Sequence, residues 1–142
     1  MQKVRIEIPE NILYTETITI GEEDINMANH MGNERILVLA NTIRENMFKA
    51  LHLNLFDIEN QLGIVIANHI AVYKAEGFLG DKITCQAGIN EVTECSFNLI
   101  FHFLKDNGKT LALLSTRCVF FDFNARKIKE LPPDFVSLFG KM

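Results

Sequence analysis

The sequence predicts an α+β fold in which one long central helix is wrapped by a curved antiparallel sheet. Apolar residues first recur at helical spacing, from residue 33 to residue 50, and then at period two in several consecutive runs. The connections between those runs are mostly too short for the crossover helix that a parallel sheet needs. One helix followed by antiparallel strands is an α+β arrangement.

The whole chain, residues 1–142, is expected to form a single domain. Its composition is 48% hydrophobic with eleven phenylalanines, which is enough for one core. No repeat, low-complexity stretch or flexible linker marks a domain boundary. The formal net charge of -4 comes from scattered carboxylates, which is typical of a soluble protein and argues against a nucleic-acid partner.

The sequence also predicts a cytoplasmic protein without a metal site. Its first residues alternate charged with apolar side chains, so neither an export signal nor a membrane span is expected there. Cys85, Cys95 and Cys118 lie in apolar runs and lack the paired spacing of a zinc or redox site. We expect them to be reduced thiols of the core.

Two short strands and then the long helix are expected in the first part of the chain. Residues 4–8 and residues 17–20 alternate apolar with polar side chains, and Pro9 separates them. The helix is expected to start near Asn33, and Glu34 in its first turn suits the helix dipole. Leu37 and other apolar residues widen its surface, which favours a helix cradled by the sheet. Its main apolar stripe consists of Ile36, Ala40, Ile43, Met47 and Ala50.

The rest of the chain predicts a meander of strands and a short terminal helix. The strands are residues 63–73, 82–89, 95–104 and 110–123, rich in Ile, Val, Phe and Thr. The helix would begin at the Pro132-Pro133 pair. His69 and His102 lie inside strands, where hydrogen bonding is the expected role. One strand carries a stripe that forms either core or an acyl channel: Phe97, Leu99, Phe101 and Phe103.

The segment before the helix, residues 24–33, is dense in polar groups. Asn29 or Asn33 could cap the helix, and Gly32 lets the backbone approach a ligand. Free N–H groups of Met31, Gly32 and Asn33 could polarise a carbonyl. Thioester hydrolysis needs such donors and a carboxylate, for which Asp24 is the nearest candidate. His30 could act in acid/base chemistry or serve only as a local hydrogen-bonding residue.

This segment resembles the hydroxybenzoyl-CoA thioesterase branch of the hot-dog fold acyl-CoA thioesterase superfamily. The resemblance extends from about Thr15 to Pro133 and includes Tyr73, the Gly80-Asp81 pair and the closing pattern from Phe121 to Lys127. It implies a metal-independent thioesterase acting on acyl-CoA or acyl-carrier-protein substrates, with coenzyme A as part of the substrate and no other cofactor.

The resemblance also implies site residues. It places the catalytic carboxylate on Asp24 and the oxyanion donor on the backbone N–H of Met31 or Gly32, with His30 nearby and Asn33 fixing the loop. Many relatives carry the Asp four residues before the His, which is Asn26 here. In that register an amide replaces the carboxylate and could only orient water or substrate.

Three cations and the subunit assembly complete these expectations. Arg126, Lys127 and Arg117 are candidates for binding the phosphates of coenzyme A, and the first two could equally be solvated. The resemblance implies a homodimer, or a homotetramer, whose sheets join edge to edge with the site at the interface. The alternatives are a non-catalytic acyl-thioester-binding protein and a purely structural dimerisation module.

Overall fold

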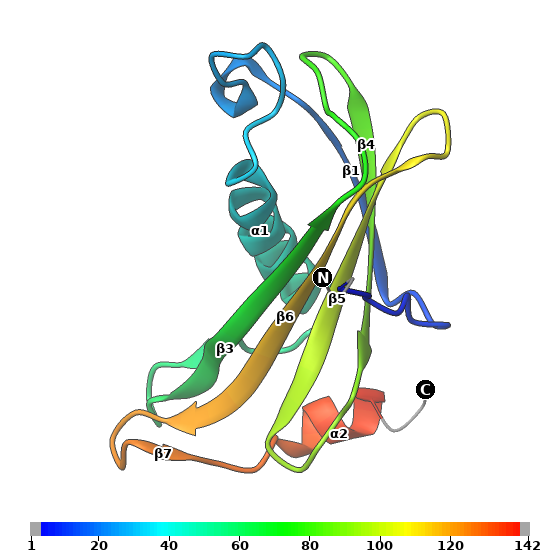
Figure 1. Cartoon of the computed structure of the whole chain (residues 1–142). Helices are drawn as coiled ribbons and strands as arrows, with labels where there is room; N and C mark the ends of the chain where they lie inside the picture. The colour runs from blue at the N-terminus through cyan, green and yellow to red at the C-terminus, as the bar shows by residue number, and fades with distance from the viewer. Residues whose placement is uncertain (1–3, 140–142) are drawn as a thin grey trace.

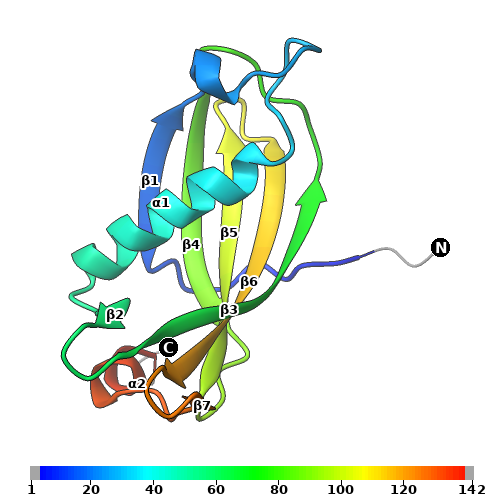
Figure 2. The same cartoon turned by 90° about the vertical axis from the view of Figure 1, so that its left-hand side faces the viewer.

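The computed structural model describes residues 4–139, in which one antiparallel sheet curls around a helix (Figures 1 and 2). This confirms the predicted hot-dog architecture. The elements in chain order are β1 (Tyr14–Thr19), the 3-10 turn η1 (Glu22–Asp24), α1 (Arg35–Ala50), β2 (Phe56–Asp57), β3 (Leu62–Tyr73), β4 (Lys82–Asn90), β5 (Ser96–Lys105), β6 (Thr110–Asp122), β7 (Lys127–Ile128) and α2 (Pro133–Phe139).

The strand order corrects one part of the sequence prediction. The sheet runs β1-β4-β5-β6-β3-β2, with β7 on β6, and all its pairs are antiparallel. Only β4, β5 and β6 form a meander, whereas β3 pairs with β6 rather than with β4. The connection from β3 to β4 therefore passes over one end of the sheet, and this places the turn that follows β3 beside the loop that precedes α1 (Figure 1).

Helix α1 lies across the concave face of the sheet, as Figure 2 shows. Ile36, Ala40, Ile43 and Met47 are buried there, which confirms most of the predicted stripe. Ala50 is exposed instead, and Phe48 takes the place at the end of the buried face. At this end of the helix an aromatic cluster lies opposite, and the larger Phe48 side chain packs against it.

The aromatic cluster closes the core at the C-terminal end of α1. Phe48 lies 6.4 Å from Phe97 and 5.7 Å from Phe135 between ring centroids, and Phe139 lies 4.8 Å from Phe97. Helix α2, which the sequence predicted at the Pro132-Pro133 pair, contributes the rings of Phe135 and Phe139. All four members of the β5 stripe are fully buried in the core, so the core interpretation is confirmed: Phe97, Leu99, Phe101 and Phe103.

The N-terminal segment does not form the first predicted strand. Residues 4–8 have no regular structure, and Val4 and Ile8 are about half exposed. The segment crosses the convex face of the sheet, near Ile100 and Ser115, instead of running along an edge (Figure 2). A segment that crosses strands finds no row of backbone partners, so alternation alone does not make it a strand.

Strand β3 leaves a long edge of the sheet open. Its other neighbour, β2, pairs only with Leu62 and Gly63 at the beginning of the strand. Farther along, residues 67–70 are exposed, and β3 bulges between Ile66 and Asn68. Unpaired N–H and C=O groups on such an edge can accept another strand.

Candidate functional site

The segment between η1 and α1 folds as a closed loop. The N–H of Asn26 donates to the carbonyl of His30 at 3.0 Å, and the N–H of Asn29 donates to the carbonyl of Asn26 at 3.1 Å. Asn29 has a φ of 64°, a left-handed conformation that Asn tolerates better than most residues. Met31 then turns into the core, where it is 7% exposed. These contacts fix the direction in which the chain enters the helix.

Asp24 holds this loop to the helix from inside the protein. Its side chain is only 4% exposed, and its carboxylate accepts from the backbone N–H of Gly21 and from Nε of Arg35, each at 2.9 Å. A buried carboxylate needs such donors to remain charged. Both carboxylate oxygens are thereby engaged by groups of the protein, and Asp24 is not among the residues that line the nearby cavity.

A cavity of about 370 Å³ opens at the start of α1. It lies between the closed loop, the end of β3 and the turn that follows β3. The structure thus brings together His30, Met31, Gly32 and Asn33 of the predicted site with Asn26, the residue of the alternative register, but leaves Asp24 outside. The lining residues are Asn26, His30, Met31, Gly32, Asn33, Tyr73, Ala75, Glu76, Gly77 and Leu111.

Of the three backbone donors expected at this cavity, two are already bonded to carbonyl groups of the backbone. The N–H of Met31 donates to the carbonyl of Gly77 at 2.7 Å, and that of Gly32 donates to the carbonyl of Asp24 at 2.9 Å. Both amides are used to close the loop. Within residues 4–139, the N–H of Asn33 has no hydrogen-bond acceptor. Since the N-cap residue, Glu34, makes no capping bond through its side chain, the predicted caps are absent and this donor stays available.

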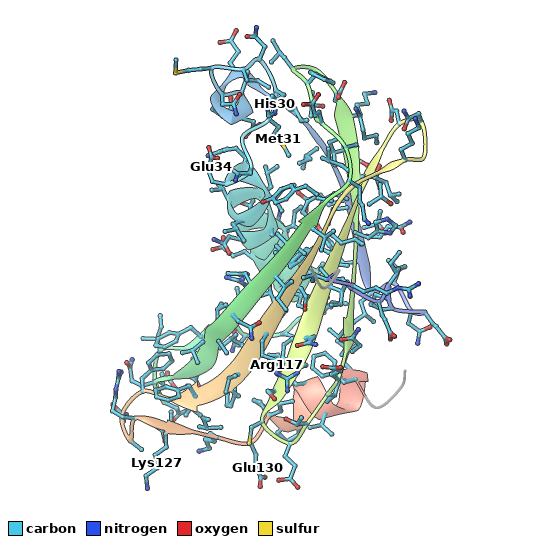
Figure 3. All side chains as sticks on the ribbon, in the orientation of Figure 1. His30, Met31, Glu34, Arg117, Lys127 and Glu130 are labelled. Atoms are coloured by element: carbon cyan, nitrogen blue, oxygen red, sulfur yellow. The ribbon has the colours of Figure 1, made fainter. Side chains whose placement is uncertain are left out.

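His30 offers a proton acceptor at the cavity. Its Nδ1 lies 3.1 Å from the carbonyl oxygen of Met31. A carbonyl only accepts, so Nδ1 carries the proton in this contact and the neutral imidazole keeps Nε2 as an acceptor. His30, Met31 and Glu34 are labelled together at the start of α1 in Figure 3.

Tyr73 forms a wall of the cavity and joins β3 to the start of the helix. Its hydroxyl donates to the carbonyl of Asn33 at 2.5 Å. Partial burial and the nearby Glu34 carboxylate raise the pKa of Tyr73, so the phenol stays protonated as a donor at neutral pH. Periodicity predicted the strand but not this contact, because residues 33 and 73 meet only in the folded sheet.

The three candidate phosphate-binding cations lie away from this cavity within one chain. Lys127 and Arg117 lie toward the opposite end of the molecule from His30 (Figure 3). Arg117 donates to the carbonyl of Glu91 and to the side chains of Asn98 and Ser96, so its guanidinium organises the convex face. Arg126 stands over the Phe121 ring at 5.6 Å.

The remaining polar candidates have structural partners. His69 Nδ1 lies 2.9 Å from Thr116 Oγ1, and His102 Nε2 lies 2.8 Å from Thr110 Oγ1, as expected for hydrogen-bonding histidines. Burial raises the pKa of the Cys118 thiol to about 12. The cysteines are free thiols, two of them buried.

The described part of the chain has neither a cluster of metal ligands nor a helix that could span a membrane. Among residues 4–139, no three His, Cys, Asp or Glu side chains cluster closely enough to hold a metal ion. No helix in that part of the chain has the length and apolar character required to cross a membrane.

Comparison with known proteins relates both the chain and the fold to thioesterases. The model of a family described as the thioesterase-like superfamily matches residues 20–139. No curated protein sequence matches the chain. Among solved structures, a 1,4-dihydroxy-2-naphthoyl-CoA thioesterase from Synechocystis is similar with a TM-score of 0.83 and 17% identity, over 91% of this chain and 96% of the other.

Two further solved structures share the fold. A hypothetical protein from Staphylococcus aureus in complex with CoA has a TM-score of 0.84 and 17% identity, over 96% of this chain and 87% of the other. A gentisyl-coenzyme A thioesterase has a TM-score of 0.78 and 18% identity, over 89% of this chain and 99% of the other.

Proposed function

The chain belongs to the thioesterase-like superfamily, and we propose that it hydrolyses the thioester bond of an acyl-coenzyme A in the cavity at the start of α1. The observation that carries this proposal is that one cavity contains both a hydrogen-bond donor and a proton acceptor. The donor is the N–H of Asn33 and the acceptor is Nε2 of His30, and neither has a hydrogen-bond partner within residues 4–139. Two fold neighbours named as CoA thioesterases, and a third that was solved in complex with CoA, support this substrate class.

In the proposed reaction, the N–H of Asn33 donates to the thioester oxygen, which becomes negative when water attacks the carbonyl carbon. Nε2 of His30 takes a proton from that water. The tetrahedral intermediate then collapses, the carbon–sulfur bond breaks, and the imidazolium returns the proton to the departing sulfur. The products are a carboxylic acid and free coenzyme A thiol, and Asn26 at the cavity wall orients the attacking water.

A homodimer completes the site in this proposal. Antiparallel pairing of two β3 edges about a two-fold axis would place the start of one β3 opposite the end of the other. Leu62, at the start of β3, pairs with Asp122. Arg126 is the last residue of the turn that follows Asp122, and Lys127 begins β7. Tyr73 at the other end lines the cavity. Arg126 and Lys127 of the partner subunit would thus approach the cavity mouth, where coenzyme A phosphates need cations.

Release of free thiol from a panel of acyl-CoA and acyl-carrier-protein thioesters tests the proposal. His30→Gln keeps a polar side chain but no proton acceptor of similar basicity, and we expect kcat to fall about 10²-fold or more. His52→Gln is the matched control, because this exposed histidine lies just beyond the C-terminal end of α1 and does not line the cavity, and its kcat should stay near that of the wild type. Equal rates for His30→Gln and the wild type would exclude His30 as the base.

The second candidate is a protein that binds an acyl thioester without hydrolysing it. The amide of Asn26 favours this function, because it lines the cavity where Asp24 does not. The substitution Asn26→Asp separates the candidates. A binding protein should retain thioesters unhydrolysed and gain turnover with the new carboxylate, whereas an enzyme that uses His30 should already turn over without it.

A further inference from the structure

Arg44 carries buried hydrogen-bond donors that the fold itself leaves unused. Its Nε and Nη1 atoms are inaccessible to solvent and have no partner within residues 4–139. No carboxylate in that part of the chain lies within ion-pair distance of this guanidinium. Unsatisfied charged donors are costly, so an uncompensated guanidinium here calls for an acceptor.

The position of Arg44 on α1 directs it toward the open edge of the sheet. Asn46 donates to Glu16 of β1, and this contact defines the flank of the helix that faces β1. Arg44 is two residues away and therefore lies on the other flank, toward β3. This placement agrees with the pKa of His69 on β3, which is lowered first by the burial of His69 and second by the charge of Arg44. The guanidinium thus lies between the helix and the strand whose edge is unpaired.

The groups around the guanidinium do not neutralise it. His69 lies on the helix side of the sheet, where its ring contacts Thr116. Burial, and secondly the charge of Arg44, lower the pKa of His69, so its imidazole is neutral at neutral pH. Cys118 also faces Arg44, and burial keeps its thiol protonated. Thr116 is fully buried, and its hydroxyl is used by His69. Arg44 therefore retains a positive charge and free donors in an otherwise neutral environment.

Small and apolar residues lie between Arg44 and the cavity. Ala40 and Leu37 precede Arg44 on the helix, and Ala71 lies between His69 and Tyr73 on the same face of β3. Arg44 is nine residues beyond the first helical residue, about 13 Å along the axis, and its side chain leans about one turn back toward the helix start. The free donors are therefore roughly 10 Å from the proposed thioester position.

We propose that Arg44 binds an acceptor oxygen, best a carboxylate, at the far end of an acyl group about 10 Å long. This inference rests on the proposed thioesterase site. The acyl chain would run from the cavity at the start of α1 along Leu37, Ala40 and Ala71, between the helix and β3. Arg44 would then decide which thioesters the protein prefers, without touching the reacting atoms.

The test compares octanoyl-CoA, ω-hydroxyoctanoyl-CoA and suberoyl-CoA, which differ only in the far end of the acyl group. The wild type should prefer suberoyl-CoA over octanoyl-CoA by about tenfold to a hundredfold in kcat/KM, with the hydroxy compound between them. In Arg44→Met, which keeps length but not donors, this preference should disappear. Lys49→Met, an exposed cation of the same helix, should retain it.

A binding experiment distinguishes failure of this inference from failure of the proposed hydrolysis. It measures the dissociation constants of three non-hydrolysable thioether analogues, one for each of the three thioesters. Suppose that no thioester is hydrolysed, but that the affinities of the analogues follow the same order in the wild type and become equal in Arg44→Met. The proposed hydrolysis then fails and the role of Arg44 stands. If the wild type shows no preference by rate or by binding, the inference is wrong. It is also wrong if Arg44→Met changes only the oligomeric state, because the donors then belong to a subunit contact.

Discussion

The two ends of helix α1 are held in place by different kinds of interaction. At the C-terminal end, Phe48 packs against rings of β5 and α2 in a fully buried cluster. At the N-terminal end, the ion pair of Asp24 with Arg35 and a closed loop hold the helix, and a cavity remains beside it. Tight packing leaves no room for a ligand, whereas the hydrogen-bonded end leaves an amide donor and a space. The comparison predicts that stability depends mainly on one end and ligand chemistry on the other.

The largest stability effect should come from the aromatic end. Phe97 is fully buried and contacts rings from both helices. We expect Phe97→Ala to lower the free energy of unfolding by about 3–5 kcal/mol through lost burial and a cavity. Urea unfolding measures this loss, with Phe78→Ala, an exposed ring, as the control that should change little. A similar small loss for both variants would contradict the proposed division of roles.

A smaller effect is expected where the loop is tied to the helix. Asp24→Asn removes the charge that Arg35 compensates, and because Arg35 is partly exposed we expect a loss of about 1–3 kcal/mol in the free energy of unfolding. Arg35→Met should cost a similar amount, and the double variant should cost less than the sum.

The same pair tests the original sequence prediction for Asp24. If Asp24 is mainly a structural group, the two single variants should change kcat by similar small factors. A loss of kcat in Asp24→Asn that far exceeds the loss in Arg35→Met would show that the carboxylate takes part in the reaction, contrary to the buried and bonded position in the structure.

The sequence predicted the elements well because periodicity records which face of each element is buried. The stripe of α1 and the alternation in β3 to β6 gave their bounds to within one or two residues of the observed ones. The strand order was missed in part, because periodicity shows that a strand is half buried but not which neighbour it pairs with. The place of β3 beside β6 depends on a connection that crosses the end of the sheet.

The site was predicted less completely than the fold. The loop of residues 26–33 was located correctly, since its polar residues and glycine stand out against the apolar runs around it. Which amides remain free depends on contacts with Gly77, a residue far along the chain, and spacing carries no information about such contacts. The same is true of Tyr73 and of the unpaired donors of Arg44.

The pH dependence of stability should be weaker than either substitution and should come from the sheet rather than from the site. Burial lowers the pKa of His102, and burial with the Arg44 charge lowers that of His69, from the ordinary value of 6.5. Below that value the unfolded chain binds protons before the folded one does. The free energy of unfolding should therefore be highest above pH 6.5 and decrease as the pH falls below that value.

Urea unfolding across this range checks the sign, and the double variant His69→Gln with His102→Gln should flatten the dependence. An increase in stability on acidification would contradict the direction of both shifts.

The smallest stability effect is expected at the cavity itself, for Gly32→Ala. A Cβ atom at this position would meet the carboxylate of Glu34 at 2.6 Å, and this is the far end of an exposed, flexible side chain that can turn away. The backbone of Gly32 is not among those with positive φ, so Ala adds no backbone strain. The melting temperature should change by only a few degrees. Thioester hydrolysis should nevertheless fall, because the added methyl group stands beside the N–H of Asn33, where the thioester oxygen would lie. Unchanged activity with unchanged stability would mean that the substrate does not approach this part of the backbone, and the oxyanion site would have to lie elsewhere along the cavity.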